Sequence, residues 1–204
     1  MESAFNPEEQ VQNIDAKLIY GLEKVSQIYR VLLWQTQSET GLSPIQSQIL
    51  IFMLFHDEKL VSISNFAIEF SVTKATVSDA FKTLIKKGLV RKEQDITDKR
   101  RQILKLTEEG IVMAEKIKSY TQPLEQSLSV LTTKKKEQFF SLLKDVLGEL
   151  NRNDIISPLR MCTTCRHYEK RDGKSYCNLM ESVLKESELR LDCAEYDALE
   201  NNEG

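Results

Sequence analysis

Apolar residues recur mainly at three- and four-residue spacing along this chain, which predicts a protein built mostly from helices. Long helical runs cover residues 7–39 and 108–152, and Gly41 ends the first of them. Residues 43–46 (Ser-Pro-Ile-Gln) open a strongly apolar helix, with proline in its first turn and glutamine placed for a capping box. Pro123 interrupts the second long run, so we expect a kink or break there.

Between these runs, the pattern predicts two short helices joined by a tight turn. The first covers residues 64–70 with Ser64 as its N-cap, and the second runs from Thr73 to Lys86. Gly88 supplies the left-handed stop after the second helix. The second helix carries an apolar stripe that must face a core, formed by Val77, Phe81, Leu84 and Ile85.

The opposite face of this second helix is short, polar and basic, which suits the major groove of DNA. Small side chains let the backbone approach base edges, hydroxyls bond to bases or phosphates, and lysines neutralise phosphate charge. We expect the helix contacts to come from Thr73, Lys74, Thr76, Ser78, Lys82 and Lys86. Asp79 departs from this pattern, because a carboxylate repels phosphate although it can accept from a cytosine amino group.

A basic hairpin is predicted next, with strands at 89–93 and 101–106 around a polar turn. Such a hairpin, about residues 89–106, forms a wing beside a helix-turn-helix. Arg100 at its tip can enter the minor groove, Arg101 is a second candidate contact, and Asp98 can brace the Arg100 guanidinium. The alternative is an ordinary solvated turn, but the order helix, turn, helix, glycine, strand, basic tip and strand favours a winged helix.

These motifs resemble the MarR family of winged-helix transcriptional regulators. Residues 98–110 fit its wing pattern D-x-R-x5-L-T-x-x-G without a gap, and residues 73–78, 84–90 and 42–46 resemble its recognition helix, exit strand and preceding helix start. The resemblance covers about residues 10–150. It implies a mainly α fold with a small β-wing, in which a winged helix-turn-helix domain is flanked by N- and C-terminal dimerisation helices.

The resemblance also implies partners and a function. The family-like domain spans residues 1–152, and its outer helices, about 7–39 and 108–152, would interlock with a second copy. The expected protein is a homodimer that binds a double-stranded DNA operator, acts as a repressor and takes a small-molecule effector near the junction of its dimer and DNA-binding parts. A two-fold dimer would place its recognition helices on successive turns of DNA. A monomer with a larger helical core is the alternative.

The charge distribution agrees with DNA binding although the whole chain is acidic. Its formal net charge is −3, yet residues 60–105 hold ten basic and five acidic side chains, a local charge of +5. Phosphate responds to local charge, because fields are screened over about 8–10 Å at ordinary salt. The polar start and the lack of a long apolar run predict a cytoplasmic protein without membrane contact. His56 and His167 accompany no nucleophile or glycine-rich phosphate loop, so we expect no enzyme activity.

All cysteines lie in an additional C-terminal segment, residues 159–196, followed by an acidic tail at 197–204. A short segment with so few apolar residues seldom folds unaided. A short amphipathic helix is nevertheless predicted at about 178–186. Four thiolates suffice for structural zinc or, alternatively, for an iron-sulfur cluster, and metal-free thiols or a disulfide remain open. His167 is a further candidate ligand. The predicted metal ligands are Cys162, Cys165, Cys177 and Cys193.

The cysteine segment leaves more than one function open. It could cap the dimer structurally, or sense metal or redox state by unfolding beside the dimerisation helices. A different class of protein would use an iron-sulfur segment for electron transfer, with the winged helix as scaffold. A third possibility is a protein–protein adaptor that no longer binds DNA, which the acidic overall charge and Asp79 would suit.

Overall fold

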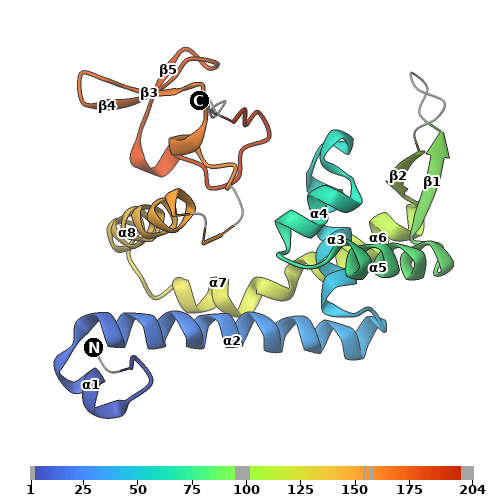
Figure 1. Cartoon of the computed structure of the whole chain (residues 1–204), viewed down its shortest axis with the longest axis horizontal. Helices are drawn as coiled ribbons and strands as arrows, with labels where there is room; N and C mark the ends of the chain where they lie inside the picture. The colour runs from blue at the N-terminus through green and yellow to red at the C-terminus, as the bar shows by residue number, and fades with distance from the viewer. Residues whose placement is uncertain (1–2, 95–101, 154, 157–158, 199–204) are drawn as a thin grey trace. The chain divides into compact units, whose positions relative to one another are not determined.

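The computed structural model describes residues 3–94, 102–153, 155–156 and 159–198. It divides into two compact units, one made of residues 1–55 and 78–124 and the other of residues 56–77 and 125–204. Helices dominate, and a two-stranded and a three-stranded antiparallel sheet complete the described part of the chain (Figure 1). The prediction of a mainly helical chain with a small wing is confirmed. No helix in the described ranges is both long and apolar enough to cross a membrane.

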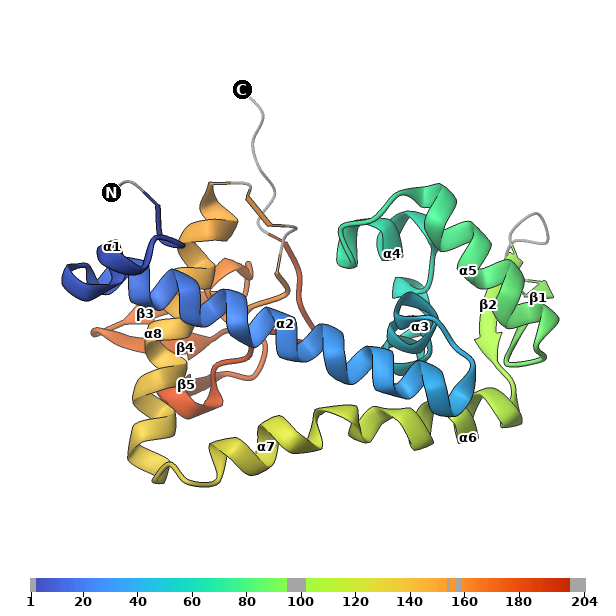
Figure 2. The same ribbon diagram turned by 90° about the horizontal axis from the view of Figure 1, so that it is seen from below.

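The first unit is built around α3 (Pro44–Phe55), which packs against α2 (Ile14–Thr40) and α6 (Glu108–Ile117). Figures 1 and 2 show α2 with η2 (Lys118–Thr121) alongside it. The apolar character predicted for α3 is explained by this sandwiched position. The buried side chains of the first unit include Leu32, Leu33, Ile49, Leu50, Phe52, Leu84, Ala114 and Ile117.

The first long helical run is interrupted, which corrects the prediction of one helix over residues 7–39. A short α1 (Pro7–Gln12) ends at Asn13, whose backbone is extended with φ −115°. The Asn13 side chain accepts a hydrogen bond from the Asp15 backbone N–H at 2.9 Å and so caps α2. An asparagine that can satisfy a free backbone donor favours a new helix start over continuation. As predicted, α2 ends at Gly41, with φ +66°.

Two short helices, α4 (Ile63–Glu69) and α5 (Lys74–Lys86), occupy the predicted helix-turn-helix positions. The cap of α4 is Ser62 rather than Ser64, because the Ser62 Oγ accepts from the Asn65 N–H at 3.1 Å. Thr73 caps α5 as predicted, with its Oγ1 accepting from the Thr76 N–H at 3.1 Å.

A Schellman turn ends α5, as the glycine stop predicts. Gly88 has φ +72°, its N–H donates to the Ile85 carbonyl at 2.9 Å, and the Leu89 N–H donates to the Leu84 carbonyl at 3.0 Å. Leu89 is buried, so its side chain seals the turn. The chain therefore leaves α5 in a fixed direction and enters the wing.

The wing consists of β1 (Val90–Gln94) and β2 (Gln102–Leu106), paired antiparallel with Val90 opposite Leu106. Thr107 joins the wing to α6: its Oγ1 donates to the Gly88 carbonyl at 2.6 Å and accepts from the Gly110 N–H at 3.0 Å. The predicted strands are confirmed. The predicted tip residues Asp98, Arg100 and Arg101 lie outside the described residues.

The predicted break near Pro123 is confirmed. The α-helical pattern stops at Ile117, η2 follows, and α7 (Gln122–Leu128) continues. Proline lacks an N–H and its ring clashes with the carbonyl four residues earlier, which explains why the irregular turn precedes it. Thr132 then caps α8 (Thr133–Arg152), its Oγ1 accepting from the Lys135 N–H at 3.4 Å.

The C-terminal segment forms a small antiparallel sheet in the order β3-β4-β5, with η3 before it and η4 after it. The predicted helix at 178–186 is wrong. Cys177 pairs with Ser182, so the four residues between them form a hairpin loop, and Glu181 has φ +52°. The segment's elements are η3 (Cys162–Thr164), β3 (Tyr168–Arg171), β4 (Lys174–Cys177), β5 (Ser182–Leu184) and η4 (Glu186–Glu188).

Candidate nucleic-acid interface and cysteine centre

The polar face of α5 is exposed, whereas its apolar stripe is buried. Of the predicted contact residues, Thr73, Lys74, Thr76, Lys82 and Lys86 are exposed and Ser78 is half-buried. On the other face Val77, Ala80, Phe81 and Leu84 are buried, and Ile85 is half-buried. The helix therefore exposes its short and basic side chains to solvent, while the predicted stripe anchors it.

Asp79 is paired within this face. The Lys82 Nζ donates to the Asp79 Oδ1 at 2.8 Å, and both side chains are more than 70% exposed, at 74% and 73%. The Thr73 and Thr76 hydroxyls also lie 2.9 Å apart. The pair partly neutralises the Asp79 carboxylate, so its repulsion of phosphate is weaker than the sequence alone indicates.

The two strands of the wing carry a charge cluster that the sequence did not reveal. The Glu93 carboxylate lies 2.7 Å from the Arg91 Nε and 3.4 Å from the Lys105 Nζ. The hydrogen bond from Arg91 lowers the pKa of the Glu93 carboxyl, which therefore stays ionised. The sequence shows only that charges alternate along the two strands. Which of these charges meet depends on the strand register, which the sequence does not give.

A cavity of about 230 Å³ lies between α2 and the η2 region of the first unit. Leu32, Ile117 and Pro123 supply apolar walls, while Glu39 and Lys116 supply charged groups. Tyr120 also lines it, and burial raises the pKa of its phenol. No motif in the sequence marked this cavity, because its walls come from segments about 80 residues apart in the chain.

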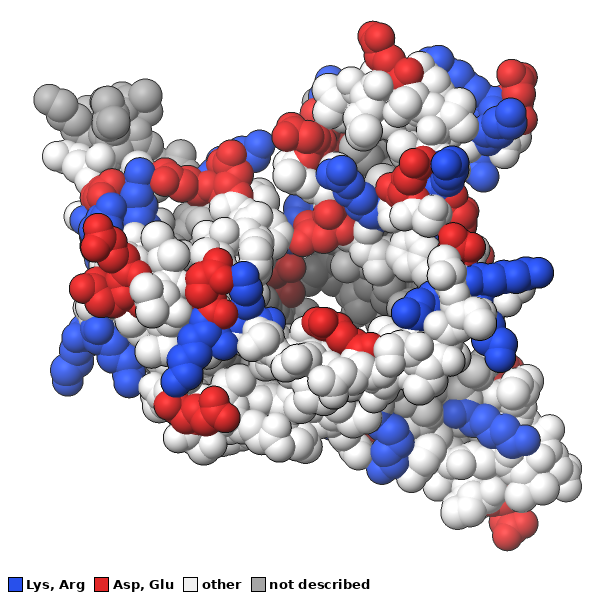
Figure 3. All heavy atoms as spheres, turned by 180° about the vertical axis from the view of Figure 1, so that it is seen from behind, with Lys and Arg blue, Asp and Glu red and all other residues white. Residues whose placement is uncertain are grey.

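An apolar stripe runs along the exposed side of the first two helices. Its members recur at helical spacing and are between 42% and 69% exposed: Val11, Ile14, Leu18, Leu22, Val25 and Ile28. Figure 3 shows few charged side chains over α1 and the start of α2 on the face it displays. On α8, Phe139, Leu142 and Val146 are likewise exposed. Large apolar side chains exposed at helical spacing are typical of interaction surfaces.

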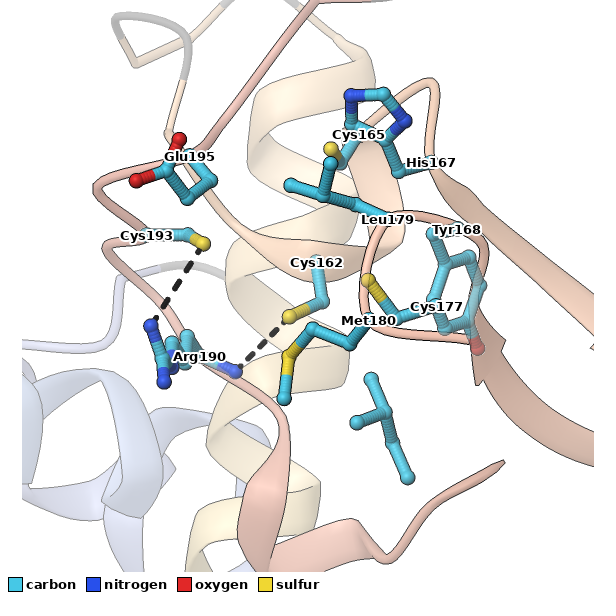
Figure 4. Close-up of a pocket in the computed structure, with 11 residues that line it drawn as sticks. Cys162, Cys165, His167, Tyr168, Cys177, Leu179, Met180, Arg190, Cys193 and Glu195 are labelled. Carbon is cyan, nitrogen blue, oxygen red and sulfur yellow. Dashed lines mark hydrogen bonds between the residues drawn. The ribbon is translucent and has the colours of Figure 1, made fainter. Parts of the chain in front are cut away.

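The four cysteines line one small cavity of about 50 Å³ in the C-terminal segment (Figure 4). Cys162 begins η3, Cys165 follows it, Cys177 ends β4, and Cys193 follows η4. Leu179, Met180 and Leu184 form the apolar walls, and His167 is also at the edge of the cavity. The fold therefore gathers all four predicted ligand residues around a common space.

The sulfur atoms receive hydrogen bonds from Arg190. Its backbone N–H donates to the Cys162 Sγ at 3.2 Å, and its guanidinium lies 3.9 Å from the Cys193 Sγ (Figure 4). Burial raises the pKa of the Cys162 thiol, and the backbone bond from Arg190 opposes that shift. Within the described ranges, no three His, Cys, Asp or Glu side chains lie at metal-binding distance. The donor set fits zinc chemically, since it offers four thiols in an apolar cavity with a hydrogen-bond donor.

The contacts of the cysteine segment extend beyond its predicted end at residue 196. The Arg166 N–H donates to the Asp197 carbonyl at 2.8 Å, and Cys165 forms a β-bridge with Ala198. The His56 Nε2 lies 2.8 Å from the Asp192 carboxylate. No spacing in the sequence indicates this contact.

Comparison with known proteins supports the winged-helix assignment. Residues 40–101 match the sequence model of the MarR family, a range that covers α5 and the first strand of the wing. No curated protein sequence matched the chain.

Solved structures of Staphylococcus aureus MepR are similar in fold. A MepR–DNA complex is 26% identical with a TM-score of 0.54, over 64% of this chain and 96% of that one. MepR in its DNA-binding conformation is 25% identical with a TM-score of 0.56, over 65% and 98%. MepR described as a transcription regulator of the multidrug efflux pump MepA is 24% identical with a TM-score of 0.51, over 64% and 96%. The chain therefore has the winged-helix fold of MarR-family regulators.

Proposed function

We propose that this chain is a sequence-specific DNA-binding transcriptional regulator that acts as a homodimeric repressor. The exposed polar face of α5 carries the proposal, because its lysines and hydroxyls stand opposite a buried apolar stripe. In this proposal α5 reads the major groove and Arg100 enters the minor groove. The likeness to a DNA-bound MepR supports it.

The homodimer is supported by the exposed apolar stripe of α1 and α2. A monomer seldom leaves so many large apolar side chains exposed along one helix. A second copy of the same stripe is a natural cover, since two-fold interfaces are self-complementary. Sedimentation equilibrium tests this, and Leu18→Glu together with Leu22→Glu should shift the dimer toward monomer.

Selection from random duplex DNA tests the function directly. The expected result is an inverted repeat whose half-sites lie about one helical turn apart. Arg100→Ala should weaken binding, and Lys82→Ala should lower the salt slope by about one per phosphate contact in each site copy. Lys134→Ala, an exposed lysine on α8, is the charge-matched control. A selection that enriched no sequence would favour the adaptor function instead.

We also propose that the cavity between α2 and η2 takes a small-molecule effector. Its apolar walls and its charged Glu39 and Lys116 suit an amphipathic compound. Tyr120→Ala should change the concentration at which such a compound releases DNA. A compound that acts equally on the variant and on the wild-type protein binds elsewhere.

For the cysteine segment we propose structural zinc held by Cys162, Cys165, Cys177 and Cys193, with an iron-sulfur cluster as the alternative. The shared cavity and the N–H bond to Cys162 support a four-thiolate site. Bound zinc would staple a segment too small to fold on apolar burial alone. Metal analysis of protein purified without oxygen decides between them, because an iron-sulfur cluster absorbs visible light. A coloured, redox-active protein that binds no DNA would favour electron transfer.

A further inference from the structure

A cluster of four charged or titratable side chains joins the cysteine segment to the chain around α4. The Arg160 Nη1 lies 2.8 Å from the Glu69 Oε2, and the Arg160 Nε lies 2.7 Å from the Asp192 Oδ1. The second Asp192 oxygen lies 2.8 Å from the His56 Nε2. Two members come from the cysteine segment and two from residues 56–69, so the cluster ties two distant stretches of sequence together.

The cluster is built into the same backbone as two of the cysteines. The Cys193 N–H donates to the Arg160 carbonyl at 2.9 Å, and Asp192 immediately precedes Cys193. Cys162, two residues after Arg160, donates its N–H to the Arg190 carbonyl at 3.0 Å. A change in what binds the Cys162 and Cys193 thiols therefore affects the same backbone that positions Arg160 and Asp192.

At its other end, the cluster reaches the end of α4, the helix that precedes the DNA-reading helix. Glu69 is the last residue of α4, and His56 directly follows α3. The turn after Glu69 is tightly bonded, since the Phe70 N–H donates to the Phe66 carbonyl and the Val72 N–H to the Ala67 carbonyl, both at 3.0 Å. Thr73 then caps α5. Backbone hydrogen bonds to α4 therefore hold the chain up to Val72, directly before the cap of α5.

Three of the four side chains are largely sheltered from solvent. The Arg160 side chain is 12% exposed, His56 is 17% and Glu69 is 28%, whereas Asp192 is 47% exposed. A sheltered guanidinium that loses its carboxylate partners pays a large desolvation cost, so the pairs persist or the segment moves as a whole.

We propose that Arg160 and Asp192 are positioning residues through which the four-cysteine centre fixes α4, and with it the turn that leads into the DNA-reading helix α5. Only the expected effect on operator affinity rests on the proposed function. The coupling itself concerns contacts within the chain and is measurable without DNA.

Hydrogen exchange of the full-length protein tests the coupling. Arg160→Gln, and separately Cys162→Ser combined with Cys193→Ser, should each speed exchange of the amides at residues 63–70 by about tenfold or more. A variant that combines all three substitutions should exchange no faster at residues 63–70 than either variant alone, because the arginine and the cysteines act through one contact. Glu69→Gln should match Arg160→Gln although Glu69 lies 91 residues from Arg160. Unchanged exchange at 63–70, or fully additive effects, would overturn the proposal.

Arg166→Gln is the matched control, since Arg166 pairs with Asp197 inside the cysteine segment at 3.0 Å. It should leave exchange at 63–70 unchanged. Wild-type exchange in β1 and β2 shows that each variant keeps its winged-helix fold. In the DNA arm, Arg160→Gln should weaken operator binding and remove its dependence on the cysteines. If no operator is found, the proposed function fails while the exchange result still decides the coupling.

Discussion

Lys82 donates a hydrogen bond to Asp79 one turn earlier on the exposed face of α5, with 2.8 Å between Nζ and Oδ1. The pair lies in the middle of the surface proposed to meet DNA. Because both side chains are well exposed, the pair adds at most about 1 kcal/mol to stability. Its effect should therefore fall on binding rather than on folding.

Asp79→Asn should strengthen binding to non-operator DNA by about three- to tenfold at low salt, because it removes a negative charge beside phosphate. The salt dependence should also become steeper, since Lys82 is released. Fluorescence anisotropy over a salt series measures both effects. Glu137→Gln, the same charge change on an exposed residue of α8, should alter neither. A loss of affinity confined to one operator position would instead assign Asp79 to base reading.

Gly110 is required by close packing, which gives a physical reason for the glycine that ends the wing motif. A Cβ at this position would lie 1.9 Å from the Leu89 carbonyl oxygen. Gly110→Ala should therefore destabilise the fold by about 3 kcal/mol or more, as overpacking against backbone does. Urea unfolding monitored by circular dichroism measures the change.

Gly21→Ala is the matched control for that substitution. A Cβ built on Gly21 meets no atom of the described residues within 4 Å, and the position lies inside α2. The alanine should stabilise the protein by about 0.5–1 kcal/mol through helix propensity. Equal effects of the two substitutions would contradict the packing argument at Gly110.

Ser47 and Ser175 are both buried but differ in hydrogen bonding. The Ser47 Oγ has no partner among the described residues, whereas the Ser175 Oγ lies 3.0 Å from the Tyr168 hydroxyl. Ser47→Ala should stabilise by about 1 kcal/mol, because an unsatisfied hydroxyl is removed. Ser175→Ala should destabilise by about 1 kcal/mol, because the tyrosine loses a partner. Thermal unfolding of the two variants should therefore shift in opposite directions.

The helix-turn-helix and the strands of the wing were predictable because their signals are local. The stripe of Val77, Phe81 and Leu84 has helical period, Thr73 is a good N-cap, and Gly88 is a good stop. Each signal acts within a few residues, so the sequence alone places α5 and the wing. The break at Asn13 was missed because the apolar period continues across it, and only the cap marks the boundary.

The sequence indicated which residues of the cysteine segment could bind a metal, but not how the segment folds. Leu179, Met180 and Val183 fit helical spacing, yet pairing of Cys177 with Ser182 makes them a hairpin. The contacts of Arg160 with Glu69 and of His56 with Asp192 join residues 91 and 136 positions apart. Such pairs depend on how the chain folds back, which periodicity and spacing do not report.

The contact between α8 and η4 should weaken in acid. The Lys144 Nζ lies 2.6 Å from the Glu186 Oε1, and this hydrogen bond lowers the pKa of the Glu186 carboxyl from its ordinary value of 4.5. A carboxyl with a lowered folded pKa stabilises the fold fully above its unfolded value and loses that contribution as pH falls through the folded value. The effect should stay under about 1 kcal/mol, because Glu186 is 43% exposed.

Hydrogen exchange at residues 182–189, corrected for intrinsic rates, measures this contact between pH 6 and pH 3.5. The wild-type protein should lose protection as pH falls below about 4.5, the range in which a free glutamate titrates. Glu186→Gln should already have the lower protection at pH 6 and show little further loss, since no charge remains to titrate. Glu137→Gln should keep the wild-type profile. An acid profile unchanged by Glu186→Gln would assign the loss of protection to another carboxyl.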